Sequence, residues 1–241
     1  MIREIIYFGD PMCSWCWGFS PVIREIREEY AGVAPVRFVV GGLHAYETEE
    51  MSDATKAEIK DHWKQVEART GAHFDYAFFE REEFVLDTEP ACRAAVTART
   101  MNEPGALDFY EAISRSFYIE NQDTTSVETF CGLAAEAGLD ADTFAELFES
   151  DEMKQETRAE IEFTKKLGIT GFPTVVVRED DRLAVLTIGW QPFEALKPAI
   201  DEWLAEGLDP ISDDEGADDE NEYGGDEYDE DDGDDDAETI Q

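Results

Sequence analysis

The chain has 241 residues, of which 42% are hydrophobic, and its 15 phenylalanines and 5 tryptophans are enough to bury one large domain or a core domain with an insertion. Its 59 acidic residues against 19 basic ones give a formal net charge of −40. Such a surface repels nucleic acid and anionic lipid, so we expect neither as a partner. The sequence shows no secretory signal and no apolar run of about 18 residues that would cross a membrane, which favours a cytoplasmic protein.

The acidic residues are densest at the end of the chain. Residues 213–241 contain 17 of them and no lysine or arginine. Because this segment offers too little apolar area to offset the entropy of ordering, 207–241 is predicted to be a disordered acidic tail. No calcium loop fits it, since aligning Gly233 with the invariant glycine of an EF-hand puts Tyr228 and Thr239 where acids are needed. The acidic body favours adaptation to concentrated salt, as in halophilic proteins, with an acidic-ligand decoy as the alternative.

The first elements have a β-α-β pattern. An apolar β-type run from Ile2 to Phe8 breaks at 9–11, apolar spacing then predicts a helix over 19–30, and a second strand is expected at Val36–Val40. This unit implies parallel strands joined by a right-handed crossover. The carboxyl end of the first strand is therefore where an open α/β sheet usually places its chemistry.

Cys13 and Cys16 follow that strand, where a helix should begin. Their spacing puts both on one helical face about one turn apart, and a disulfide needs Cα atoms only about 4.4–6.8 Å apart. A helix N-terminus favours negative charge, so the Cys13 thiolate is expected to be stabilised. Cys13 is then the nucleophile and Cys16 the resolving thiol, and the pair itself is the redox group, with no further cofactor.

The sequence pattern predicts helices in the middle of the chain, and then two strands and a last helix. Apolar spacings of three and four predict helices over 53–70, 89–101, 104–117, 126–137, 141–148 and 152–166. Two β-rich runs at 174–178 and 183–187 then flank a turn, which predicts a hairpin, and a last helix is expected over 193–204.

The order of these motifs resembles the DsbA family of the thioredoxin superfamily. A β-α-β unit carries Cys-x-x-Cys, a helical insertion follows, and Gly171-Phe172-Pro173-Thr174 then opens a hairpin with a closing helix. The motif over 10–18 looks like the FrnE-like branch. The resemblance implies an α/β thioredoxin-like fold, with a large helical insertion between the N-terminal βαβ and the C-terminal ββα unit. We accordingly assign 1–48 and 168–206 to a discontinuous thioredoxin-like domain and 49–167 to the insertion.

The resemblance also implies an activity and a site. Members are thiol-disulfide oxidoreductases in which the bond before the residue matching Pro173 is cis and the residue matching Phe172 presents its backbone to an extended substrate. A trans proline at an ordinary strand entry is the alternative. Beside Cys13, Cys16 and Pro173, we expect four residues to bind the substrate, which is a protein or small-molecule thiol or disulfide: Ser14, Trp15, Phe172 and Thr174.

Two departures from the family bear on the chemistry. Some members carry a histidine between the cysteines, whereas Ser14-Trp15 has no titratable group, so a very strongly oxidising potential is not expected. Some members also bury an acid in the first strand, whereas Ile5–Phe8 is apolar. Asp10 is a candidate substitute for proton handling, with a structural role at the approach to the helix as the alternative.

Other functions remain open. Structural zinc needs four ligands, usually with a second close pair, and neither Cys92 and Cys131 nor the three histidines provide one. Cys92 and Cys131 lie on apolar helix faces, where buried free cysteine is common, the alternative being a second redox pair. A DsbA-like adaptor whose cysteines sense redox state is the second functional hypothesis. A glutathione-dependent transferase or isomerase of the kappa type is the third, although such proteins typically have serine at the position of Cys13.

Overall fold

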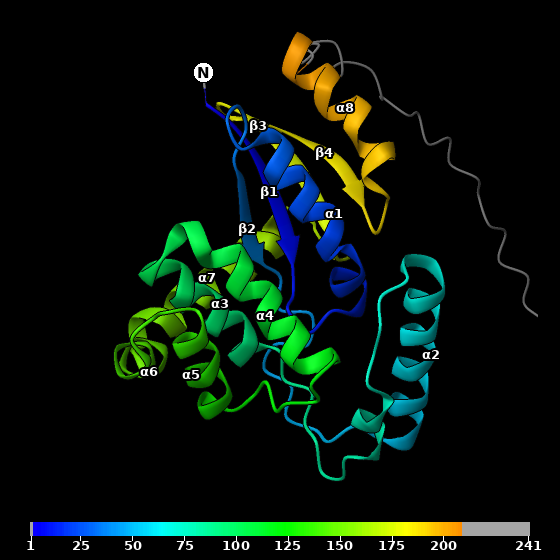
Figure 1. The fold of residues 1–241 in the computed structure, drawn as a ribbon, viewed down its shortest axis with the longest axis vertical. Coiled ribbons are helices and arrows are strands. Elements are labelled where there is room, and N and C mark those ends of the chain that lie inside the picture. The colour runs from blue at the N-terminus through cyan, green and yellow to red at the C-terminus, as the bar shows by residue number, and fades with distance from the viewer. Residues whose placement is uncertain (1, 209–241) are drawn as a thin grey trace, which may run out of the picture. The chain divides into compact units, whose positions relative to one another are not determined.

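The computed structural model describes residues 2–208, and within them the strands form one four-stranded sheet in the order β2-β1-β3-β4 (Figure 1). β1 (Arg3–Gly9) runs parallel to β2 (Val36–Val40). β3 (Thr174–Glu179) is antiparallel to β1, and β4 (Arg182–Ile188) is antiparallel to β3. The two halves of the sheet, which are more than 130 positions apart in the sequence, therefore meet where β1 pairs with β3.

The central strand β1 is buried on both of its faces. Successive side chains of a strand point to opposite sides, so Ile5 and Tyr7 enter the main core while Ile6 and Phe8 enter a smaller one. The main core also receives the apolar faces of α1 (Ser14–Tyr30) and α8 (Phe193–Glu206). On the other side, the ring of Phe163 from α7 (Asp151–Lys166) lies 6.3 Å from that of Phe8. The end of β1 is therefore held from both sides.

Six α-helices and two short 3₁₀ helices separate β2 from β3 within the described range. Their bounds are α2 Asp53–Thr70, η1 Tyr76–Glu80, α3 Glu89–Met101, η2 Glu103–Gly105, α4 Ala106–Tyr118, α5 Val127–Glu136, α6 Ala141–Glu149 and α7 Asp151–Lys166. Figure 1 shows α3 to α7 gathered beyond one end of the sheet, with α2 standing apart from them. Ser52 caps α2 by accepting a hydrogen bond from the Thr55 backbone, and Gly71 ends it with φ 77°.

The architecture confirms the α/β thioredoxin-like fold with a large helical region that the sequence predicts. Apolar spacing indicates only the part of α1 from residue 19 onwards, whereas the helix begins at Ser14 with Cys13 as its N-cap, where the cysteine motif predicts a helix N-terminus. The cysteine motif and the following helix are thus one element. The described residues pack as one compact unit, and the division into a discontinuous domain and an insertion remains a prediction.

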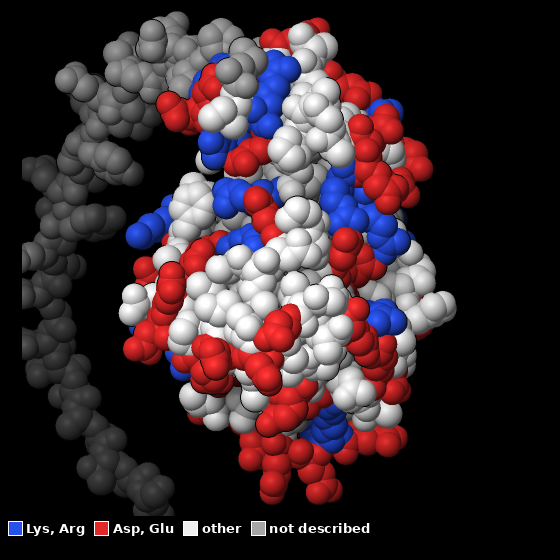
Figure 2. Space-filling view, turned by 60° about the vertical axis from the view of Figure 1, so that its left-hand side comes forward, with Lys and Arg blue, Asp and Glu red and all other residues white. Residues whose placement is uncertain are grey.

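The acidic tail predicted for 207–241 lies, from residue 209 onwards, outside the described residues. Among residues 2–208, no helix is both long and apolar enough to span a membrane. Acidic side chains are spread over the face seen in Figure 2. This distribution agrees with a high net negative charge on the body, and the adaptation to concentrated salt inferred from it remains a prediction.

Candidate active site

The two cysteines lie at the first turn of α1. Cys13 is the N-cap residue, and its backbone N–H donates to the Asp10 carbonyl at 3.0 Å. The Cys13 carbonyl accepts from the Trp17 N–H at 3.0 Å, which closes the first turn. Cys13 is 5% exposed and Cys16 is fully buried, and neither is bonded to another cysteine. The first cysteine is thus the more exposed of the two residues, as a nucleophile followed by a resolving thiol requires.

The loop before β3 closes over the first cysteine. The Phe172–Pro173 peptide bond has the cis geometry that the family resemblance implies. The Cys13 thiol donates to the Phe172 carbonyl, with 3.7 Å between sulfur and oxygen. Thr174 pairs with Phe8 of β1, and this register brings the loop to the carboxyl end of β1. Sheet pairing thus brings together two motifs about 160 positions apart.

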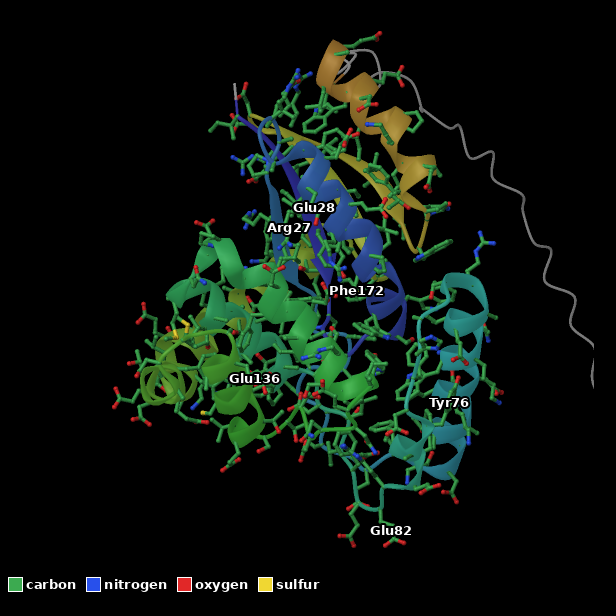
Figure 3. All side chains as sticks on the ribbon, viewed as in Figure 1. Arg27, Glu28, Tyr76, Glu82, Glu136 and Phe172 are labelled. Carbon is green, nitrogen blue, oxygen red and sulfur yellow. The ribbon has the colours of Figure 1, made fainter. Side chains whose placement is uncertain are left out.

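Phe172 occupies space that a glycine leaves free. A Cβ added to Gly41 would lie 2.0 Å from the Phe172 ring, so only glycine permits this close approach. The Gly41 N–H donates to the Gly9 carbonyl at 2.8 Å, which ties the two strand ends together. Figure 3 shows Phe172 at the end of the sheet where α1 begins. The ring is therefore part of the site's wall.

Asp10 is fully buried below the motif. Its two carboxylate oxygens accept from the Met12 N–H at 2.8 Å and from the Leu43 N–H at 2.7 Å, and the Cys92 thiol lies 3.6 Å from the second oxygen. Burial raises the pKa of the Asp10 carboxyl. Because backbone and thiol donors already occupy both oxygens, this geometry favours the structural role that the sequence left open.

The remaining cysteines do not form a second pair. Cys92 is buried on α3 against Asp10, and Cys131 lies on α5, where its thiol donates to the Ala141 carbonyl. Both are free thiols, and each donates a hydrogen bond to a neighbouring oxygen. Within residues 2–208, no group of three or more His, Cys, Asp or Glu side chains is arranged to hold a metal ion.

The protonation of Cys13 is governed by opposing influences. The neighbouring Cys16 thiol and burial raise the pKa of the Cys13 thiol, and the backbone N–H of Cys16 in the first helical turn lowers it. The negative charge of the Asp10 carboxylate also raises the pKa of the Cys13 thiol. The expectation of a stabilised thiolate is corrected accordingly: in the reduced protein, burial and neighbouring groups outweigh the helix N-terminus, and the pKa of Cys13 is raised.

The raised pKa of Cys13 predicts how the reaction rate of its thiol depends on pH. Only the thiolate is nucleophilic, so the rate of Cys13 alkylation by iodoacetamide should rise about tenfold per pH unit from about pH 6 to 8, without a plateau. The reaction is followed by mass spectrometry of the Cys13 peptide in the reduced protein. A rate that levels off in this range would show that the thiolate is already formed and would contradict the raised pKa.

Two hollows share Trp15 and Phe172 as lining residues, and Cys13 lines one of them. One of about 330 Å³ is lined by Cys13, Ser14, Trp15, Phe172 and eight other residues. The other, of about 660 Å³, is lined by Trp15, Phe172, Ile188, Trp190 and four more residues. Trp15 and Phe172 border both, so the predicted binding residues Ser14, Trp15 and Phe172 come together around Cys13. Thr174 is buried in β3 and donates to the Gly171 carbonyl, so it supports the loop and lies outside both linings.

The structure adds groups that the sequence reasoning missed. His44 and His62 line the smaller hollow and Arg69 lines the larger, and none of the described residues lining either hollow is an acid. Nothing in the spacing of these three residues points to Cys13. Tyr7 belongs to the apolar run of the first strand, and strand alternation places it on the side that faces α1.

Comparison with known proteins decides the family. The family model described as DSBA-like thioredoxin domain matches residues 4–201. The chain belongs to this family. A candidate protein disulfide isomerase from Nitrosomonas europaea has 36% sequence identity and a TM-score of 0.81, over 85% of this chain and 98% of that one.

Two more distant relatives of this DSBA-like chain carry different descriptions. The cytosolic disulfide reductase DsbM from Pseudomonas aeruginosa has 24% identity and a TM-score of 0.70, over 84% of this chain and 98% of that one, and supports the fold. The ClpXP adapter protein SpxH of Halalkalibacterium halodurans is 23% identical over 208 residues, which are 83% of this chain and 67% of the adapter. The narrower FrnE-like assignment remains a prediction.

Proposed function

We propose that this protein is a thiol-disulfide oxidoreductase that exchanges disulfides through Cys13 and Cys16. The observation that supports it most is the placement of the Cys13 thiol, at the N-terminus of α1, one turn before Cys16 and 3.7 Å from the Phe172 carbonyl. Membership in the DSBA-like family and the 36% identical structure from Nitrosomonas europaea support the same chemistry.

The mechanism has two displacements. The Cys13 thiolate attacks one sulfur of a substrate disulfide, which forms a mixed disulfide and releases the first substrate thiolate. Cys16 then loses its proton and attacks the Cys13 sulfur, which forms the Cys13–Cys16 disulfide and releases the second substrate thiolate. Each released thiolate takes up one proton, and the substrate gains the two electrons that the cysteine pair loses. Run backwards, the same steps oxidise a dithiol.

The surroundings of Cys13 suit a substrate that presents its backbone and apolar groups. The Cys13 thiol donates to the Phe172 carbonyl, and the aromatic side chains of Trp15 and Phe172 line the hollow that Cys13 also lines. In a chain of net charge −40, hollows lined by Arg69, His44 and His62 and by no described acid also admit anionic substrates. Protein and small-molecule disulfides are both compatible with this arrangement, in a cytoplasmic setting.

A redox-sensitive adaptor is the second candidate, and the similarity to SpxH proteins favours it. Reduction of insulin disulfides by a thiol reductant separates the two. The enzyme hypothesis predicts turnover that saturates with insulin and continues for many equivalents per protein molecule. Binding of a partner in fixed stoichiometry without turnover would contradict it and favour the adaptor.

A kappa-type transferase or isomerase is the least favoured candidate, because both cysteines are present at the start of α1. Glutathione binding that persists at full strength in Cys16→Ser, together with no insulin turnover by the parent chain, is the result that this alternative predicts.

A further inference from the structure

The larger of the two hollows, of about 660 Å³, contains an arginine without an acidic partner. Arg69, near the end of α2, lines it together with Trp190. Most other arginines of the described range pair with an acidic side chain. Within residues 2–208, Arg69 forms no ion pair and no hydrogen bond. In a chain with 59 acidic residues, this guanidinium is therefore left available for an external anion.

The position of Arg69 is fixed by its contact with Trp190. The guanidinium carbon lies 5.2 Å from the centroid of the Trp190 ring, which is a cation–π contact. The Trp190 Nε1–H donates to the Gly18 carbonyl of α1 at 3.1 Å. A Cβ added to Gly18 would lie 2.8 Å from Val66, so α2 packs closely against α1 at the same residue. Both partners of the contact are thus anchored on the helix that begins at the cysteine motif.

The larger hollow is within reach of a substrate bound at Cys13. Trp15 and Phe172 line both hollows, and the Phe172 carbonyl oxygen lies 3.7 Å from the Cys13 sulfur. A substrate whose sulfur meets Cys13 lies against these two side chains, so the groups next to its disulfide extend into the larger hollow. Ile188, which is 71% exposed at the end of β4, gives that hollow an apolar wall as well.

We propose that Arg69 binds the carboxylate of an acidic residue beside the disulfide of a protein substrate, and that Trp190 positions the guanidinium for it. The proposal rests on the exchange function proposed above. No described residue that lines the hollow is an acid, so the charge of Arg69 is not cancelled there. A peptide also brings the apolar groups that suit Trp15, Phe172 and Ile188. In molar salt the Debye length is about 3 Å, so repulsion by the acidic body is screened while ions in direct contact still attract.

The test compares two substrates that differ in one charge. Two short peptides with an intramolecular disulfide are identical except for one residue beside a cysteine, which is glutamate in one and glutamine in the other. Their reduction by the reduced protein is followed by mass in molar salt. The parent chain should reduce the glutamate peptide faster. Because Arg69 is exposed, Arg69→Gln should lower the ratio of the two rates about threefold.

Three further variants separate the charge from its position. Lys60→Gln is the matched control, because it removes a cation of the same helix that lies 5.6 Å from the Phe79 ring and lines neither hollow. It should leave the ratio unchanged. Arg69→Lys keeps the charge without the planar donors and should retain part of the preference. Trp190→Leu should lower the ratio less than Arg69→Gln does, and an unchanged ratio would overturn its positioning role.

The ratio distinguishes recognition from structural damage. Equal slowing of both peptides in Arg69→Gln leaves the ratio unaltered and would overturn the proposal, as would equal falls in Arg69→Gln and Lys60→Gln. A small aromatic disulfide, with and without carboxylates, tests the source of the anion. If Arg69→Gln affects the preference for the carboxylated small disulfide and not that for the glutamate peptide, the assignment to protein substrates is wrong.

Failure of the exchange function is distinguishable from failure of this proposal. If the parent chain reduces neither peptide, the exchange function fails. Binding of the same two peptides with S-methylated cysteines then still decides the role of Arg69, and it is followed by tryptophan fluorescence because Trp15 and Trp190 line the hollow. The parent should bind the glutamate peptide more tightly than Arg69→Gln does, and equal dissociation constants would overturn the proposal.

Discussion

Replacement of Cys13 by serine is expected to abolish disulfide exchange. The serine hydroxyl keeps the size and hydrogen-bonding capacity of the side chain but is not ionised near neutral pH, so no nucleophile remains at the start of α1. Insulin reduction by Cys13→Ser should fall to the uncatalysed rate. Cys131→Ser is the matched control, because it removes a half-buried thiol on α5 and should retain full turnover.

Replacement of Cys16 should have a different effect on the same reaction. In Cys16→Ser the first displacement can still occur, but no thiol is left to resolve the product. A mixed disulfide between Cys13 and the substrate should therefore accumulate to one equivalent, and mass spectrometry of the intact protein detects it. Exchange activity retained by Cys13→Ser, or a mixed disulfide formed on another cysteine, would contradict the assignment of roles.

Trp63→Ala should cause a large loss of stability. Trp63 is 1% exposed, and its ring lies 4.7 to 5.2 Å from those of Phe74, Phe78, Phe79 and Tyr118. Truncation of a buried tryptophan leaves a cavity and typically costs about 3–5 kcal/mol. Denaturant unfolding followed by circular dichroism measures this cost as a lower midpoint.

The reason for so large an effect is that α2 has few other anchors. Of its residues, only Trp63 and Val66 are buried, and α2 also supplies Ile59 and His62 to the hollow beside Cys13. Lys64→Ala is the control, since Lys64 is exposed on the same helix and its loss should change stability by less than about 0.5 kcal/mol. Equal unfolding midpoints for the two variants would contradict the anchoring role of Trp63.

Much of the fold is predictable from local pattern. The helix predicted over 53–70 matches α2, because Ser52 and Gly71 mark its ends in the sequence, and the strand predicted at 36–40 matches β2. The start of α1 is predictable from the position of the cysteine motif after the first strand and not from apolar spacing. The motif lacks an apolar period of its own, so the spacing indicates only the later part of the helix, from residue 19.

The site is predictable only where a compact motif identifies it. Cys13, Cys16 and the Phe172–Pro173 loop can be recognised from such motifs, and their meeting follows from the pairing of β1 with β3. The contributions of His44 and His62 depend on how the loop after β2 and α2 pack, and no short-range pattern encodes that packing. The raised pKa of Cys13 likewise depends on burial by residues distant in the sequence.

The measurement that tests the central claim most directly is the redox equilibrium of the Cys13–Cys16 pair. The reduced protein is equilibrated in molar salt with graded thiol-disulfide buffers, and alkylation of the remaining thiols is followed by mass. Strongly oxidising pairs owe their potential to a stabilised thiolate, which the raised pKa of Cys13 does not provide. We therefore predict a disulfide whose potential lies nearer to the roughly −270 mV of thioredoxin than to the roughly −120 mV of DsbA. If no disulfide forms between Cys13 and Cys16 at any buffer ratio, the exchange mechanism is wrong.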